Sequence, residues 1–434
     1  MADAPIEPDS LSGVVFALEG FEGVTVLLNG PTGCKYYHAA LSDSQTLRRT
    51  LFDPMRFPMS WYFGQPRVPC TFLDNADYVY GSEAKLADAL EGLRGIPELE
   101  LLCIVNTPGA ALIGDDLDGI VRRHGGGTPC MCVETPGFSE GMCAGHERAL
   151  CALVDHVVPL QPDGVAASSE VIPHSVNVLG LSLYQRHHVG DVTELRRMVE
   201  AMGLTVECML GAGCTLQELS NIGRAALNVV VYPELGLQTA RFLQQRFGTP
   251  FYVCSAPPVG FEATERFARD LARLAGGDAG PIEAECREAR KRAFSFLSRV
   301  NSTTGLPRGV PFAVEGMYSE LRAYVEFLVD YLALMPVSLT PAFPQADCAR
   351  DGLLDALRER GFADCLGAEA EQAEPELFFG SGSTIGLLRL AGVRCTGVET
   401  MLPTLGYLDV VPKTHLGPVG ALRVVEAVLN GLIY

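Results

Sequence analysis

Residues 24–37, VTVLLNGPTGCKYY, give the strongest indication of the fold that we expect for this chain. The first five of these residues are apolar or β-branched and predict a buried parallel strand. Gly30, Pro31 and Gly33 then favour a tight turn, so Cys34 lies where the strand gives way to a helix. The partial positive charge of a helix N-terminus favours the thiolate of such a cysteine. Two interpretations follow: a metal ligand or nucleophile at Cys34, or a structural glycine turn with a buried thiol.

The composition describes a well-folded protein with more than one domain. The chain has 434 residues, 48% hydrophobic and 20% charged, and one core rarely accounts for this length. Its formal net charge of −19 argues against a nucleic-acid partner, because a phosphate backbone requires a basic surface. The sequence shows no secretory signal pattern and no apolar run near the ~20 residues of a membrane helix. We therefore expect a cytoplasmic protein with neither a nucleic-acid nor a membrane partner.

The 14 cysteines are expected to be reduced thiols, most of them small core residues. Three of them lie near turns rich in glycine or proline, or in the strand that leads to one, and are better ligand candidates: Cys34, Cys70 and Cys103. Cys34 is the first choice because of its turn, and Cys103 is the weakest because its strand position favours the core.

Strand-like and helix-like segments alternate along the whole chain. The expected strands are residues 24–28, 101–106, 129–133, 175–180, 205–209, 227–232, 251–254, 311–314, 337–339, 377–379 and 397–400. Such alternation predicts an α/β protein with doubly wound parallel sheets. We expect three Rossmann-like domains at residues 1–170, 171–278 and 279–434, the last opening with a connector helix at 282–297. Ligands gather at the carboxyl ends of such strands, so one central site between domains is expected.

A series of motifs follows in order along the chain. After residues 13–34 come YVYGSEAKL (78–86), LIGDD (112–116), ETPGFS (134–139), VNVLG (176–180), LNVVV (227–231) and PVGFEAT (258–264). Together they resemble the component 1 oxidoreductases of the nitrogenase superfamily. The resemblance covers the whole chain and implies three Rossmann-like domains around a central cleft.

The resemblance also implies an iron–sulfur cluster at Cys34, with Gly30, Gly33 and Thr107 beside the cofactor. Family members with the large double cluster use three cysteines per subunit, and the other two positions fall here near Asp9 or Ser10 and at Thr107. For Asp9 two interpretations remain, an oxygen ligand or a residue on a frayed N-terminus.

A [4Fe–4S] cluster requires four thiolates or close substitutes. A symmetric dimer in which each subunit supplies Cys34 and Cys70 would meet that number, so the cluster is expected at a subunit interface. The resemblance leaves open a homodimer or a heterotetramer with a related subunit.

The ligands of the nitrogenase catalytic cofactor are replaced in this chain. The cofactor cysteine corresponds to Tyr232, and the cofactor histidine corresponds to Glu399. Neither side chain suits an iron–sulfur–carbide cluster, so we expect no FeMo-type cofactor and no dinitrogen reduction.

Without the ligands of the nitrogenase cofactor, the chain resembles the simpler branch of the superfamily, which reduces carbon–carbon double bonds of tetrapyrroles or other small organic substrates. There a P-loop iron–sulfur ATPase delivers single electrons, and this chain has no P-loop motif of its own. Such a reduction needs proton donors. The catalytic candidates near expected strand ends are His38, Glu134, Glu399 and His415.

Two functions remain open. The chain is either the catalytic component of a two-component reductase, or a non-catalytic member of the same fold. The second class includes a scaffold for metallocluster assembly and the silent subunit of a heterodimer, and the missing cysteines favour it. The neighbouring histidines His187 and His188 are expected in a solvated loop.

Overall fold

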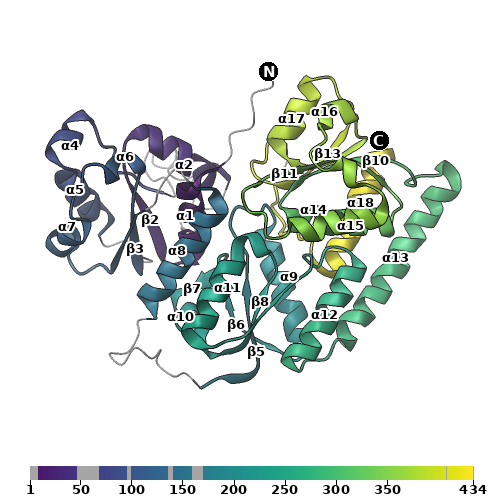
Figure 1. The fold of residues 1–434 in the computed structure, drawn as a ribbon, viewed down its shortest axis with the longest axis horizontal. Coiled ribbons are helices and arrows are strands. Elements are labelled where there is room, and N and C mark those ends of the chain that lie inside the picture. The colour runs from purple at the N-terminus through teal and green to yellow at the C-terminus, as the bar shows by residue number, and fades with distance from the viewer. Residues whose placement is uncertain are drawn as a thin grey trace. The chain divides into compact units, whose positions relative to one another are not determined.

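The computed structural model describes residues 8–45, 68–94, 99–134, 140–158, 170–406 and 408–433. The chain forms two compact units (Figure 1). Unit 1 comprises residues 1–160 and 214–219, and unit 2 comprises residues 161–213 and 220–434. All strand pairs within the sheets are parallel.

Unit 1 is built on a three-stranded sheet in the order β2 (Val24–Asn29), β3 (Leu101–Asn106), β4 (Cys130–Val133). Leu27, Leu102 and Ile104 of this sheet pack against α5 (Glu83–Leu93) and α7 (Leu117–His124). Its other elements are α1 (Ser10–Leu18), α2 (Thr32–Gln45), α4 (Asn75–Tyr80), α6 (Pro108–Ala111), α8 (Met142–Val157), the paired strands β1 (Phe21–Glu22) and β7 (Cys214–Thr215), and α10 (Leu216–Ser220).

Helices α1 and α8 cross so closely that only glycine fits between them. A Cβ at Gly13 would lie 2.0 Å from the carbonyl oxygen of Met142, and a Cβ at Gly145 would lie 2.0 Å from that of Ser10. All residues of α1 are buried, so this helix lacks the polar face by which a surface helix is recognised in a sequence. Neither α1 nor α8 is among the elements that the sequence predicts.

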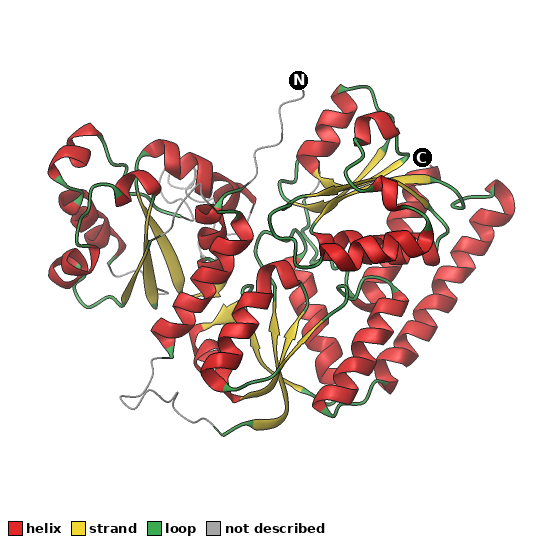
Figure 2. Cartoon of the chain, viewed as in Figure 1, coloured by secondary structure: helices red, strands yellow, loops and turns green. Residues whose placement is uncertain are grey.

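The first sheet of unit 2 has the order β6 (Thr205–Met209), β5 (Ile172–Leu179), β8 (Ala225–Val230), β9 (Phe251–Val253). The chain winds outward in both directions from β5, as in doubly wound folds. Figure 2 shows helices on both faces of this sheet. They are α9 (His188–Ala201), α11 (Pro233–Phe247) and α12 (Phe261–Ala275), with the short 3₁₀ helix η2 at Ile222–Arg224.

The second sheet of unit 2 has the order β11 (Met335–Pro341), β10 (Pro311–Gly316), β12 (Leu377–Ser381), β13 (Thr396–Met401). Its helices are α13 (Gly280–Thr304), α14 (Tyr318–Asp330), α15 (Arg350–Arg360), η3 (Ala363–Cys365), α16 (Ala370–Ala373), α17 (Gly382–Leu390) and α18 (Gly417–Ile433). Helix α18 contacts β12 and β13 as well as α9 and α12, so it joins this sheet to the elements of the first one.

The predicted fold class is confirmed, since parallel sheets alternate with helices throughout the described chain. The strands expected at residues 101–106 and 205–209 coincide with β3 and β6, and the connector helix expected at 282–297 is the central part of α13. The expected domain boundaries at residues 170 and 278 stay predictions. Among the described residues, no helix combines the length and apolar character that crossing a bilayer requires.

The crossing of α1 and α8 generates a stability prediction. Gly145→Ala is expected to lower the free energy of unfolding by about 2–4 kcal/mol, because its Cβ cannot be accommodated without separating two backbones. The matched control is Gly92→Ala in α5, where a Cβ would meet nothing within 4 Å. That variant is expected to gain up to about 1 kcal/mol from helix propensity. Chemical denaturation measures both, and equal midpoints for the two variants would contradict the prediction.

Candidate functional site

Cys34 lies in the first turn of α2, directly after the turn that follows β2. Gly30 at this turn is a position where no side chain fits, because a Cβ would lie 2.4 Å from Cγ2 of Thr107. Thr107 in turn caps α6 by accepting from the backbone N–H of Ala110 at 3.4 Å. A Cβ at Gly33 would meet nothing within 4 Å, so local packing does not require glycine there.

The segment that follows residue 67 places Cys70 at the same end of β2 as Cys34. Cys70 forms a parallel bridge with Leu28 of β2, and its Sγ donates to the carbonyl oxygen of Gly30 at 3.2 Å. Burial raises the pKa of the Cys70 thiol, and a negative charge on Cys34 raises it further. The two cysteines predicted as metal ligands therefore lie at the same, carboxyl end of β2, where the charge of Cys34 affects Cys70.

Asp9 and His38 form a buried ion pair behind Cys34. Oδ1 of Asp9 accepts from Nδ1 of His38 at 3.0 Å and from the backbone N–H of Ser12, which makes Asp9 the N-cap of α1. Burial alone lowers the pKa of His38, but the bond to Asp9 and the neighbouring Cys34 outweigh it and raise the pKa to about 9. The interpretation of Asp9 as a frayed end is therefore wrong. Its second oxygen, Oδ2, is buried without a hydrogen-bond partner among the described residues.

The other candidates of unit 1 lie apart from this pair. Glu134 is exposed directly after β4, and the other residues of the ETPGFS motif, 135–139, lie outside the described residues. Cys103 is fully buried in β3, and burial raises the pKa of its thiol well above the usual range. This burial agrees with the weak expectation for Cys103 as a ligand.

In unit 2 the structure joins two predicted residues from distant parts of the chain. The hydroxyl of Tyr232, at the start of α11, lies 2.9 Å from Nε2 of His415, and the hydroxyl of Tyr324 on α14 lies 3.2 Å from Nδ1 of the same ring. Burial lowers the pKa of His415 to about 3, so the imidazole is neutral. A neutral ring donates through one nitrogen and accepts through the other, which matches two tyrosine partners.

Asp191 on α9 completes this buried network. Its Oδ1 accepts from the hydroxyl of Thr414 at 2.6 Å and from the backbone N–H of His415 at 3.2 Å. Burial raises the pKa of Asp191 to about 6. The loop before α18 is thereby fixed to α9, and the orientation of His415 with it.

Glu399 belongs to a separate ion-pair network near the end of β13. Its carboxylate pairs with Arg186 and accepts from the backbone N–H of Gly406 at 2.7 Å. Arg186 and His187 both contact Asp409, at 3.1 Å each. The expectation that His187 is solvated is wrong, because it is buried and burial lowers its pKa to about 4.

The sequence analysis missed several residues that hold these sites together: Asp191, Tyr324, Arg186 and Thr71. The hydroxyl of Thr71 accepts from the backbone N–H of Gly30 at 3.0 Å and so fixes the turn before Cys34. None of them lies in a recognisable motif. Asp191 and Tyr324 are polar residues on helices at positions that turn out to be buried, and only the tertiary arrangement reveals their partners.

Comparison with known proteins defines the class of protein to which this fold and these sites belong. Residues 10–433 match the nitrogenase component 1 type oxidoreductases, and the chain belongs to this family. The expectation of an oxidoreductase of nitrogenase component 1 type is confirmed at this level. Membership implies an iron–sulfur cofactor.

Individual relatives are similar at lower identity. One light-independent protochlorophyllide reductase subunit, from Synechococcus sp. (strain JA-3-3Ab), is 24% identical over 278 residues, which cover 63% of this chain and 51% of that protein. The corresponding protein of Heliobacterium modesticaldum is 24% identical over 275 residues, covering 63% and 49%. The chain thus spans about half the length of the curated relatives it matches.

Solved structures support the fold over the entire chain. The structure of nitrogenase Cp1 at pH 6.5 matches with a TM-score of 0.74 at 15% identity. The match covers 100% of this chain and 94% of that one. The structure at pH 5 gives 0.69 at 16% identity. At such identities the likeness is one of fold.

The ion pair of Asp9 and His38 predicts a pH-dependent contribution to stability. The pKa of His38 is raised from 6.5 to about 9, so the folded chain binds the proton more tightly than the unfolded chain does. The stabilisation is complete below about pH 6.5 and is lost as the pH rises through about 9. In calorimetry, His38→Gln should therefore be destabilised by about 1–3 kcal/mol near pH 6, and less at pH 9 and above.

The control for this prediction is His124→Gln in the same unit. His124 pairs with Glu83 at 2.9 Å, but both side chains are substantially exposed, and exposed pairs contribute little. A His38→Gln effect that is the same at pH 6 and pH 10 would contradict the role of the charged pair.

Asp191 predicts a dependence of the same sign in unit 2, but in a more acidic pH range. Its pKa is raised from 3.8 to about 6, so folded protein binds more protons than unfolded protein in this window. The contribution of Asp191 to stability therefore falls as the pH rises from about 4 to 6. Asp191→Asn keeps an acceptor for Thr414 and His415 but cannot ionise, so calorimetry should show the wild type losing stability relative to the variant over this range. Asp351→Asn, an exposed residue of α15, is the control, and parallel curves for wild type and Asp191→Asn would contradict the prediction.

Proposed function

We propose that this chain is a subunit of a nitrogenase-like reductase that takes low-potential electrons from a separate ATP-dependent iron–sulfur reductase and reduces a small organic substrate. The observation that carries the proposal is that Cys34 and Cys70 lie at the same, carboxyl end of β2 and interact electrostatically. Two facts support the proposal. The family implies an iron–sulfur cofactor, and two thiols lie at the strand end where the cluster is expected.

The donor set fits one half of a cubane. Among the described residues, no group of three or more His, Cys, Asp or Glu side chains could hold a metal ion. Four ligands for a [4Fe–4S] cluster would therefore require two subunits. Cys34 and Cys70 would hold the cluster from this side, and the unpartnered Oδ2 of Asp9 is an oxygen acceptor in the same region. The bound cluster would supply single electrons at low potential.

Exposed apolar side chains on the elements that carry Cys34 and Cys70 support the presence of a partner over this half-site. Tyr36 and Tyr37 follow Cys34 on α2, Phe72 follows Cys70, and all three are exposed. Tyr80 at the end of α4 is 89% exposed, and Leu112 directly after α6 is 88% exposed. Aromatic side chains are enriched at the interfaces of protein complexes. The partner would be a second copy of the chain or a related subunit of a heterotetramer.

The substrate would be a tetrapyrrole or another small organic molecule with a reducible double bond. The relatives described above are protochlorophyllide reductase subunits. Dinitrogen is a poor candidate because Tyr232 and Glu399 already serve other protein groups as hydrogen-bond partners, and oxygen ligands do not suit a soft metal cluster.

The proposed proton donors fall into two groups. Glu134 is exposed and is able to meet a substrate directly. His38, Glu399 and His415 are buried, so they would act by holding or relaying protons to other groups. His38 would keep a proton at Nδ1 at neutral pH, because its pKa is about 9.

A scaffold for cluster assembly, or the silent subunit of a heterodimer, is the second candidate. It is favoured by the small number of ligands that one chain offers, two thiols in place of the three cysteines of family members with the double cluster. A silent subunit would pair with a relative that supplies the missing cysteines.

The test is the iron content and electron paramagnetic resonance spectrum of anaerobically purified protein, with and without dithionite. Wild type is expected to hold about four irons per dimer, since a cubane needs four ligands. Cys34→Ala and Cys70→Ala should each lose the iron, whereas the exposed Cys348→Ala should retain it. No iron in the anaerobic wild type would contradict a cluster held by this chain alone and would direct attention to a heterologous subunit.

A further inference from the structure

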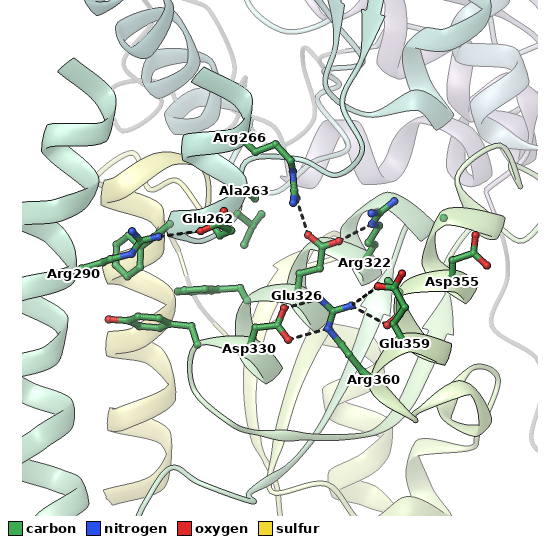
Figure 3. Close-up of a pocket in the computed structure, with 16 residues that line it drawn as sticks. Glu262, Ala263, Arg266, Arg290, Arg322, Glu326, Asp330, Asp355, Glu359 and Arg360 are labelled. Carbon is green, nitrogen blue, oxygen red and sulfur yellow. Dashed lines mark hydrogen bonds and ion pairs between the residues drawn. The ribbon is translucent and has the colours of Figure 1, made fainter. Parts of the chain in front are cut away.

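A pocket in unit 2 shares no residue with the cysteine pair or with the networks around His415 and Glu399. It has a volume of about 550 Å³ and is lined by α12, α13, α14 and α15 (Figure 3). This volume is within the range of small-molecule sites. The pocket is bounded by charged side chains of both signs and by aromatic rings, which limits the chemistry of a ligand that would fit it.

Two arginines in this pocket share one carboxylate. Arg266 donates to Oε2 of Glu326 at 2.7 Å, and Arg322 donates through Nε to Oε1 at 2.7 Å. Figure 3 shows their guanidinium groups converging on Glu326. Burial raises the pKa of Glu326, but the two guanidiniums outweigh it and hold the pKa below the usual value. The trio therefore carries a net positive charge.

The same trio retains unused hydrogen-bonding capacity. Among the described residues, each of these guanidiniums donates one hydrogen bond, to Glu326, and a guanidinium has several further N–H donors. Gly352 of α15 makes room for this arrangement, because a Cβ there would lie 2.7 Å from Nη1 of Arg322. A carboxylate is the group that matches two such guanidiniums in charge and geometry.

Carboxylates on the rim impose a second requirement. Asp330 pairs with Arg360 at 2.6 Å. Asp355 and Glu359 of α15 are mostly exposed and make only surface ion pairs, Asp355 with Arg358 at 3.1 Å and Glu359 with Arg360 at 4.0 Å. These side chains repel a polyanion such as a nucleotide, and they would attract an ammonium group. The pocket therefore places the guanidinium groups of Arg266 and Arg322 and the carboxylates of Asp355 and Glu359 around the same cavity.

Aromatic side chains form the apolar part of the lining. Phe327 and Tyr331 stack with ring centroids 5.5 Å apart, and Phe261 packs edge-on against both. Arg290 lies over the ring of Phe261 at 5.4 Å. An apolar ligand body would be buried against these rings.

We propose that this pocket binds a small zwitterion of the amino-acid type, with its carboxylate on Arg266 and Arg322, its ammonium group toward Asp355 and Glu359, and its apolar body against Phe327 and Tyr331. The proposal is independent of the proposed function. The pocket lies wholly within unit 2 and shares no residue with the cysteine pair, so its occupancy is measurable whether or not iron is bound.

The test is isothermal titration calorimetry of the full chain with L-phenylalanine, 3-phenylpropionate and phenethylamine. The first probe has both charges, the second lacks the ammonium group and the third lacks the carboxylate. L-Phenylalanine is expected to bind, and each analogue to bind about tenfold more weakly or worse. Binding of 3-phenylpropionate as tight as that of L-phenylalanine would overturn the zwitterion assignment, and no heat from L-phenylalanine would overturn the site.

Variants localise the binding. Arg322→Gln should weaken the binding of L-phenylalanine about ten- to a hundredfold, because the substitution removes a charged hydrogen-bond donor. Gly352→Ala keeps every charge but displaces Nη1 of Arg322, so it should also weaken binding. Arg389→Gln on α17, outside the lining, is the control and should bind as wild type does. Equal affinity of wild type and Arg322→Gln would show that the ligand binds elsewhere.

Discussion

The carboxylate of Asp9 is the group on which the surroundings of Cys34 depend. Its Oδ1 caps the N-terminus of α1 by accepting from the backbone N–H and the hydroxyl of Ser12, and it also accepts from His38 on α2. Because His38 lies one helical turn after Cys34, a single oxygen atom ties the beginning of one helix to the helix that presents the thiol. The pair of Asp9 and His38 is largely buried. Removing one partner of a buried charged pair costs far more free energy than removing one partner of a pair at the surface.

The strands of this fold are visible in the sequence because parallel strands buried on both faces are short, continuous apolar runs. Residues 101–106 and 205–209 illustrate this, since β3 and β6 begin and end there. Helices α1 and α8 escaped prediction for a related reason. Helix α1 is buried on all sides and therefore shows no polar face. Gly13 and Gly145 allow the close crossing of α1 and α8, but in a sequence glycine is read as a residue that breaks helices.

The site was predictable only where its residues are neighbours in sequence. Cys34 and His38, four residues apart, could be placed on one helix face, and the turn residues before them indicated a strand end. Tyr232 and His415 are separated by 183 positions, so their contact follows from how two sheets pack, which no local pattern encodes. Asp9 shows the converse error: its closeness to the chain terminus suggested fraying, whereas its partners are supplied by α1 and α2.

The burial of the thiols has a consequence for how this chain meets oxidants and labelling reagents. The thiolate is the species that reacts, and burial raises the pKa of Cys132, Cys254 and Cys286 to about 12 in each case. These thiols carry almost no thiolate at neutral pH, whereas Cys348 is exposed. A maleimide or nitroxide reagent is therefore expected to label Cys348 before these three thiols. Folding itself selects where a spectroscopic probe attaches.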